Sequence, residues 1–295
     1  MIIKNMTITN SRGDSITFGR HFRLAEDFAL SGLSATINYT ESTSDGSKYQ
    51  NTVFDNKEFE IPFIIYKSIS DFLWIEEKRN EAYKVFNPKA NPMRIGITTK
   101  ADKEYYINAN LEGVPSFPSG FENNNQVWQR GLLQFSANDP FFYSNNEEKV
   151  DIALWVGNFE FPLEISEEGI EMGYRAPSLI VNVFNDGQES TGMLIRFRAL
   201  GTLSTPSLVN VNTYESLKIN ITMLPGDVIE VSTYKRRKRV TLIRNGVISN
   251  IFNQLDLSSK FLQLDLGDNL FRYDAVEGLD NLEVSMTFTP RLLGV

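Results

Sequence analysis

The sequence contains no cysteine and a single histidine, His21, among its 295 residues. Without cysteine, disulfides, thiol catalysis and thiolate metal sites are all excluded, so stability has to come from burial, hydrogen bonding or assembly. A lone histidine also lacks the partners that imidazole catalysis and histidine metal sites normally need. We therefore expect His21 to be structural or to lie on the surface.

Long hydrophobic runs are missing as well. No window approaches the roughly 20 apolar residues that a membrane-spanning helix requires. The first ten residues, MIIKNMTITN, lack a charged leader followed by an apolar segment, so we expect neither an export signal nor an anchor. The apolar fraction of 41% and the charged fraction of 22% are typical of a soluble globular protein, and the length favours two domains over one.

Helical patterns are rare, and one stretch, residues 68–86, is typical of a helix. Ser68 followed by Asp71 resembles a capping box, and the dipeptide Asn87-Pro88 provides a stop. Charges interrupt the apolar stripe between these ends. Such a helix normally covers a sheet with one face and meets solvent or another subunit with the other.

The remainder of the first half consists of short runs in which apolar and polar residues alternate, as in half-buried strands. Two strand-like arms within residues 33–60 flank a polar stretch centred on Asp45-Gly46, a dipeptide that favours a tight turn. We predict a long β-hairpin with a projecting tip. The run NDPFFY ends this half, so we predict an N-terminal domain of residues 1–143.

From residue 144 to residue 295 the sequence contains no convincing helix, and short strand-like runs alternate with turn residues at the spacing of a β-sandwich. We predict a second domain of this class. Two segments resemble each other, because Gly226-Asp227 and Gly267-Asp268 each separate two strand-like runs. They suggest a repeated corner of the sandwich.

We assign no residue a catalytic, cofactor-binding or metal-binding role from the sequence. The stretch Gly187–Gly192 has the glycine spacing of a phosphate loop but lacks the lysine that meets the phosphates, so it is interpreted as a polar turn. A glycoside hydrolase needs two converging carboxylates. The adjacent acids Glu76-Glu77, Glu147-Glu148 and Glu167-Glu168 lie in solvated stretches, and neighbours on a strand face opposite ways.

Sugar binding without catalysis stays an open alternative. The aromatic rings of Trp155, Tyr174 or Tyr214 could stack on a sugar. Trp155, however, lies in an apolar alternation in which an inward-facing core residue is the commoner explanation.

Five consecutive cations, Lys235–Arg239, stand out in a chain of net charge -8. They lie between two strand-like runs, which predicts a hairpin turn with its flanks. Residues 144–295 contain 20 acids and 14 bases, so the half that carries the run is itself acidic. We expect a solvated edge or a protein contact in preference to a nucleic-acid site.

Together these features resemble a known family, the distal tail proteins (Dit) of long non-contractile-tailed phages that infect Gram-positive bacteria. The resemblance spans nearly the whole chain. It rests on the opening strands, the hairpin, the single helix, the strand that ends in FSANDPFFYS, and the closing series with its two Gly-Asp corners.

The resemblance implies a mainly β protein with two domains. The first would be a β-sandwich or split-barrel-like domain with one helix and a long hairpin, and the second a galectin-like, jelly-roll β-sandwich. No enzyme activity and no cofactor are implied.

The resemblance further implies a hexameric ring at the virion tail tip, made in the cytoplasm of the bacterial host. The ring would join the major tail-tube protein to a tail-associated fibre or lysin protein around a channel for DNA. The second domain would contact a receptor-binding protein, bind host saccharide or simply space the assembly. An acidic channel would not grip DNA.

Overall fold

The computed structural model divides into two compact units, which are described separately here. Unit 1 comprises Met1–Asn145 together with Leu292–Val295, and unit 2 comprises Asn146–Arg291. We predicted two consecutive domains, 1–143 and 144–295. The structure differs at the end of the chain, because Leu292–Val295 belong to unit 1. The structure describes residues 3–25, 30, 32–41, 45–66, 74–125, 127–152, 155–157, 173–175 and 180–295.

Unit 1 is built on an antiparallel sheet whose main path runs β2-β1-β7-β8-β9-β6-β3. The chain connects the two end strands β2 and β3 directly, and they lie against each other, so the sheet nearly closes into a barrel. The strands are β1 (Ile3–Thr9), β2 (Ser15–Phe18), β3 (Phe22–Leu24), β6 (Lys57–Tyr66), β7 (Met93–Thr99), β8 (Glu104–Leu111) and β9 (Trp128–Ala137), with β10 (Phe142–Ser144) beside β8.

Strict alternation explains the long central strands of this sheet. Along β6 the side chains alternate between buried and less buried positions, since successive residues of a strand point to opposite faces. The buried set contains Phe63, whose ring lies within about 6 Å of the rings of Phe18, Phe22, Phe86 and Phe117, at centroid distances of 6.2, 6.2, 6.3 and 5.9 Å. An aromatic cluster therefore forms the centre of the unit 1 core.

One α-helix, α1 (Trp74–Val85), is present in the described residues, and it packs against β2 and β6. Ala82 and Val85 on one side of it are buried in the core. The prediction of a helix in this segment is confirmed, and a short 3₁₀ turn, Pro88–Ala90, follows its end as the Asn87-Pro88 stop requires. The predicted capping pair of Ser68 and Asp71 lies outside the described residues.

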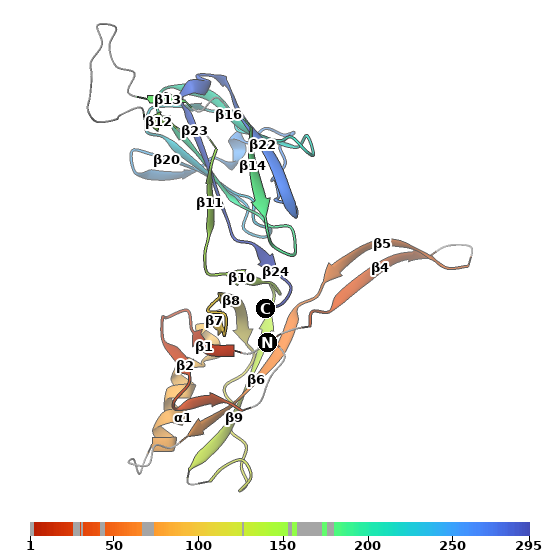
Figure 1. The fold of residues 1–295 in the computed structure, drawn as a ribbon, viewed down its shortest axis with the longest axis vertical. Helices are drawn as coiled ribbons and strands as arrows, with labels where there is room; N and C mark the ends of the chain where they lie inside the picture. Colours follow the sequence, from red (N-terminus) through yellow and green to blue (C-terminus); the bar gives the residue numbers. More distant parts are fainter. Residues whose placement is uncertain are drawn as a thin grey trace. The chain divides into compact units, whose positions relative to one another are not determined.

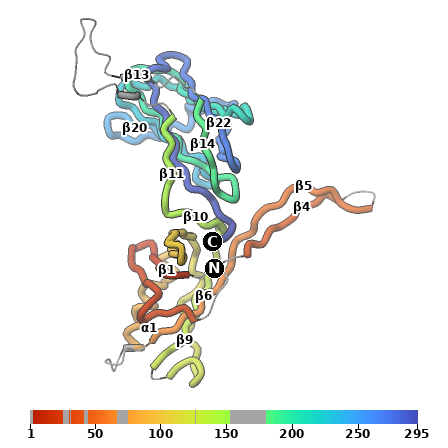
Figure 2. Tube along the Cα trace, viewed as in Figure 1, coloured from red at the N-terminus to blue at the C-terminus, as the bar shows by residue number. Residues whose placement is uncertain are grey.

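The predicted hairpin is present as β4 (Ala35–Glu41) and β5 (Ser47–Phe54), which among the described strands pair only with each other. Figure 1 shows this two-stranded ribbon extending away from the sheet of unit 1. The chain then enters the sheet at Lys57, so the hairpin is shorter at its second arm than the predicted range of 33–60. The tube in Figure 2 follows this continuous path from β5 into β6.

Unit 2 is a β-sandwich. One sheet has the order β11-β23-β15-β19-β20-β21 and the other β14-β22-β16-β17, with β18 also paired to β16. The strands are β11 (Glu148–Asp151), β14 (Ile180–Asn185), β15 (Leu194–Ala199), β16 (Leu203–Asn210), β17 (Ser216–Lys218), β18 (Thr222–Met223), β19 (Val228–Ser232), β20 (Arg239–Arg244), β21 (Val247–Asn250), β22 (Gly267–Glu277) and β23 (Leu282–Phe288).

The inner faces of both sheets supply one continuous core, in which Phe197, Phe271, Tyr273 and Phe288 are fully buried. A separate ribbon pairs β12 (Trp155–Gly157) with β13 (Gly173–Arg175), and β24 (Arg291–Leu292) leads to the end of the chain. The predicted fold class is confirmed: the protein is mainly β, with a long hairpin and, in the described residues, one α-helix in its first part and a β-sandwich in its second.

Candidate functional site

The most conspicuous candidate for an interaction site is the β4–β5 hairpin, because almost every one of its residues is exposed. Its apolar side chains are no exception: Tyr39 and Tyr49 are 56% and 57% exposed, and Ile37 and Val53 are exposed to a similar degree. A two-stranded hairpin without a covering layer is marginally stable in water at best. This ribbon therefore has the properties of a segment that gains its packing from a partner.

Polar contacts hold the two arms of the hairpin in register. The amide of Asn38 donates to that of Asn51 at 2.8 Å, and the hydroxyl of Thr36 donates to the Asp55 carboxylate at 2.8 Å at the hairpin base. A register shift after Asn38 leaves Gln50 as an additional residue, and such bulges increase the local twist. The contacts order the ribbon without burying it.

The turn prediction for this hairpin is confirmed at Gly46, whose φ is 95°. Glycine adopts this left-handed region readily because it has no Cβ atom. Asp45-Gly46 therefore leads the chain into β5 as the sequence indicates.

A second candidate is a groove of about 420 Å³ on the outer side of strands β1, β7 and β8. Arg94 lies across the ring of Tyr106 at 3.8 Å and donates to Asn145 at 2.7 Å. Asn145 donates in turn to Glu104 at 2.9 Å. Gly96 lines the groove, where its lack of a side chain leaves space. The arrangement is polar and aromatic, which suits a contact with another protein surface.

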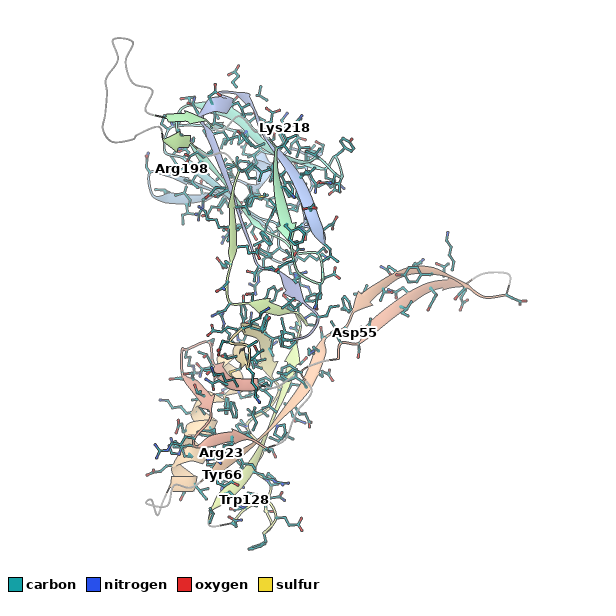
Figure 3. The ribbon with its side chains drawn as sticks, in the orientation of Figure 1. Arg23, Asp55, Tyr66, Trp128, Arg198 and Lys218 are labelled. Carbon is teal, nitrogen blue, oxygen red and sulfur yellow. The ribbon has the colours of Figure 1, made fainter. Side chains whose placement is uncertain are left out.

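A third cluster combines two arginines with two aromatic rings on neighbouring strands β3, β6 and β9. The guanidinium of Arg23 lies 4.8 Å from the ring centre of Tyr66, and that of Arg130 lies 5.6 Å from the ring centre of Trp128. Tyr66 and Trp128 are direct cross-strand partners. Figure 3 labels Arg23, Tyr66 and Trp128 at this end of unit 1. This cluster was not predicted from the sequence, because its members become neighbours only through strand pairing.

The cationic run Lys235–Arg239 connects β19 to β20, so the prediction of a hairpin turn is confirmed. All five side chains are exposed, and Arg236 has a left-handed φ of 66°. The edge of this sheet is β21, one strand beyond the pair that the turn joins. The run thus lies at one end of the sheet and not along its edge.

The remaining sequence candidates do not converge on a site. His21 is half-buried, and its carbonyl accepts the backbone N–H of Tyr66 at 2.9 Å. Tyr214 is 86% exposed in a turn with a φ of 60°. The side chains of Trp155 and Tyr174 lie outside the described residues, so their predicted stacking role stays a prediction.

The candidate phosphate loop Gly187–Gly192 is a bend followed by an extended stretch, in which Glu189 and Thr191 form isolated bridges with Arg291 and Leu264. A Cβ atom on Gly187 would lie 2.9 Å from the carbonyl oxygen of Arg291, and one on Gly192 would lie 2.7 Å from the backbone nitrogen of Tyr234. Both glycines therefore allow close backbone approach. The interpretation as a polar turn therefore holds only for the bend at Gly187 and Gln188, and packing explains the glycine spacing.

The adjacent acids that were considered as candidate carboxylate pairs do not form a converging pair in the described residues. Glu76 and Glu77 are exposed on α1, Glu147 is exposed beside the half-buried Glu148, and the pair Glu167-Glu168 lies outside the described residues. Burial raises the pKa of Glu148, and the charge of Asp186 raises it further.

The two Gly-Asp corners have the same backbone feature and different side-chain roles. Gly226 and Gly267 have φ values of 89° and 78°. Asp227 is buried, and Arg244 donates to it through Nε at 2.9 Å and through Nη2 at 2.5 Å. These hydrogen bonds hold the pKa of Asp227 below its usual range. Asp268 is exposed and accepts from Asn182 at 2.6 Å.

Within the described ranges, no group of three or more histidine, cysteine, aspartate or glutamate side chains is placed to hold a metal ion. No α-helix of the described part is long and apolar enough to cross a membrane.

The geometry thus defines a class of protein: a two-part β protein whose conspicuous features are exposed surfaces. Residues 186–292 match the family model described as siphovirus-type tail component, C-terminal domain. The resemblance to the distal tail proteins of siphoviruses is therefore confirmed, through this domain and the fold. No curated protein matches the chain in sequence.

Solved structures extend the comparison to the whole chain. The Dit protein of phage SPP1, described as a paradigm of the hub adsorption apparatus in phages that infect Gram-positive bacteria, superposes with a TM-score of 0.68. The match covers 97% of this chain and 98% of that one at 14% identity. A chain of the phage P2 baseplate in its activated conformation with Ca covers 100% of both at 10% identity, with a TM-score of 0.53. At these identities the likeness defines the fold.

Proposed function

We propose that this protein is the structural hub of a phage tail tip, and that it assembles into a hexameric ring through its β4–β5 hairpin. The observation that carries the proposal is the exposure of Tyr39, Tyr49 and their apolar neighbours on a ribbon that has no covering layer of its own. Packing that ribbon against the next copy would bury this surface. The fold shared with a hub protein of another phage supports the same role.

In this proposal the ring joins the major tail-tube protein on one face to a tail-associated fibre or lysin protein on the other. DNA crosses a central channel without specific binding. The protein is made in the cytoplasm of the bacterial host and ends in the virion, at the tip of the tail.

We assign ring formation to the predicted domain 1–143 and the outer contacts to the predicted sandwich 144–295. The sandwich would contact receptor-binding proteins or host saccharide. The role is structural and not enzymatic, and it requires no cofactor.

The experiment is a measurement of the oligomer. We expect light scattering of the purified full chain to give the mass of six copies and negative-stain microscopy to give rings. Because some rings form only when a partner is present, the measurement is repeated with the tail-tube protein. A chain that is monomeric at high concentration both alone and with that partner would contradict the proposal.

A deletion variant tests whether ring formation depends on the hairpin. In it, residues 36–53 are replaced by a short turn, which leaves the β6 strand and the unit 1 core intact. We expect a folded monomer. Rings formed as readily by this variant as by the parent chain would show that another surface makes the contact.

A further inference from the structure

The edge of the larger sheet in unit 2 lacks the usual protection against pairing. Within the described part of the chain, β21 pairs with β20 alone, so its other side is free. Natural edge strands are normally protected by charged residues, proline or a covering segment. The sequence of β21, VISN, contains no charge and no proline, and Val247 and Ile248 are 65% and 69% exposed.

The surroundings of this edge carry charge of one sign. Residues 235–260 contain seven cations and a single acid, Asp256, in a protein whose net charge is -8. Asp256 is already engaged, because it accepts hydrogen bonds from Ser258 and Asn220. Of the seven cations, Arg244 is held by Asp227. Lys235, Arg237, Lys238 and Arg239 are exposed, so positive charge predominates in this segment although the whole chain is acidic.

An aromatic pair lies between the cationic turn and the edge. The rings of Phe252 and Phe261 are stacked with centroids 5.8 Å apart, and Nζ of Lys238 lies 4.8 Å from the centre of the Phe261 ring. Phe252 follows Ile251, whose N–H donates to Val240 of β20 at 3.1 Å. The basic turn Lys235–Arg239, the aromatic pair and β21 are thus adjacent and form what we name the basic edge surface.

We propose that the basic edge surface binds an extended, acidic segment of a partner protein, which adds as a strand to β21 and places its carboxylates near the basic turn. This inference goes beyond the proposed ring. Strand addition uses the free backbone groups of an edge, while side chains beside it provide specificity. Because of charge complementarity, we expect the added segment to be acidic. Val247 and Ile248 are exposed and face opposite sides of β21, so each provides an apolar contact for one of the two alternating sets of side chains of the added strand.

An anionic polymer such as DNA or a polyol phosphate is the weaker alternative. Such a polymer would use the cations, but it offers no backbone N–H and C=O groups to pair with β21. Counterion release favours binding when many cations follow the phosphates. Here the cations are concentrated at one turn, and the apolar part of the surface would be left without a function.

The test uses the full chain and a fluorescent synthetic peptide that alternates glutamate with valine. We expect saturable binding, measured by anisotropy, and slower hydrogen exchange of the β21 amides in the complex. A second peptide has the same sequence and charge but carries N-methyl groups on alternate backbone nitrogens. Because N-methylation removes ladder donors, we expect it to bind at least about tenfold more weakly. Equal binding of the two peptides would overturn strand addition.

Two triple variants distinguish an effect of the basic turn on peptide binding from an effect of the net charge. Lys235→Gln, Arg237→Gln and Lys238→Gln together should weaken the parent peptide about tenfold. Lys149→Gln, Arg198→Gln and Arg272→Gln change the net charge equally at exposed sites elsewhere in unit 2 and should leave binding unchanged. Equal effects of the two triple variants would overturn the assignment to this surface.

The edge itself is tested with Ile248→Pro, which removes a backbone donor without a change of charge. We expect loss of peptide binding with an unchanged melting temperature of the core. A glycerol-phosphate polymer and single-stranded DNA are titrated in parallel. If either bound through the turn while the acidic peptide did not bind at all, the proposal would be wrong.

Discussion

Tyr39 and Tyr49 face each other across the β4–β5 hairpin, with ring centroids 6.4 Å apart at an interplanar angle of 74°. Each ring is more than half exposed, although aromatic pairs of this kind are normally covered. The pair therefore fits a surface that becomes buried on assembly.

The first prediction concerns this pair. Replacing both tyrosines, Tyr39→Ser with Tyr49→Ser, should abolish or strongly weaken ring formation, since aromatic residues at the centre of interfaces often contribute about 2 kcal/mol or more each. Unfolding of the monomer should change little. The measurement is sedimentation velocity across a concentration series, combined with thermal melting.

Tyr214→Ser is the control for the pair, because Tyr214 is the more exposed residue and lies in unit 2. It should leave the oligomer unchanged. An equal loss of assembly in the control and in the double variant would exclude a special role of the hairpin.

The second prediction concerns the unit 1 core. A Cβ atom on Gly131 would lie 2.6 Å from Cε1 of Phe63 and closer still to Cζ, and the Phe63 ring is fully buried in the aromatic cluster. Gly131→Ala should therefore destabilise the protein by about 1–3 kcal/mol through overpacking. Urea unfolding measures the change.

Gly96→Ala is the matched control, because it is also a strand glycine of unit 1. Its Cβ atom would meet only the carbonyl oxygen of Thr7 at 3.6 Å, which is an ordinary contact. We expect a change below about 0.5 kcal/mol, as at other permissive surface positions. A change for Gly131→Ala as small as the change for Gly96→Ala would show that the Phe63 ring accommodates the added methyl group.

The third prediction concerns the Asp227–Arg244 pair. Arg244→Gln should destabilise unit 2 by about 1–3 kcal/mol, since it leaves the buried Asp227 carboxylate without its main donor. Arg196→Gln removes a more exposed pair with Glu230 and should cost less than about 1 kcal/mol. Urea unfolding at neutral pH compares the two variants.

The Asp227 pair also has a pH signature. The pKa of Asp227 is lowered in the folded protein, so its contribution is complete above the ordinary aspartate pKa of about 3.9 and is lost as the pH falls through the lowered value. Arg244→Gln should flatten this loss of stability on the acid side. An unchanged acid limb would contradict the assignment.

The fourth prediction concerns Glu148, whose pKa is shifted in the opposite direction to that of Asp227. Burial and Asp186 raise the pKa of Glu148, so the folded state holds a proton there more tightly than the unfolded chain does. The ionised Glu148 therefore disfavours folding at neutral pH, and this penalty disappears as the pH falls through the raised pKa toward the ordinary value.

Glu148→Gln should accordingly raise the melting temperature near pH 7 and lose this advantage at about pH 3, below the ordinary glutamate pKa of about 4.3, where the glutamate is protonated in both states. Melting curves at both pH values provide the test. Glu147→Gln, an exposed neighbour, serves as the control and should show no such difference. A gain for Glu148→Gln that is the same at both pH values would contradict the titration mechanism.

Local pattern was sufficient for a large part of the fold. The alternation of apolar and polar residues at the start of the chain predicted the half-buried strands β1 and β2, Asp45-Gly46 predicted the hairpin turn, and Asn87-Pro88 predicted the end of the helix. In each case the determining interactions lie within a few residues of one another. Backbone geometry and side-chain periodicity alone therefore specify the element.

Relationships between distant residues could not be obtained in this way. The two Gly-Asp corners are alike in sequence, yet only strand pairing buries Asp227 beside Arg244 while Asp268 stays exposed. The basic turn could be recognised in the sequence as five consecutive cations, whereas Phe252 and Phe261 become its neighbours only in the folded sandwich.

The sequence by itself thus determined a cysteine-free, mainly β protein with one helix, a long hairpin and an exposed cationic turn, since composition and short-range periodicity are local properties. Only the tertiary structure decided which residues share a surface. Register places Gly131 opposite Phe63 and Tyr39 opposite Tyr49, and sheet order makes β21 an edge. The physical reason is that a contact surface is formed by strands that pair across long separations in the chain.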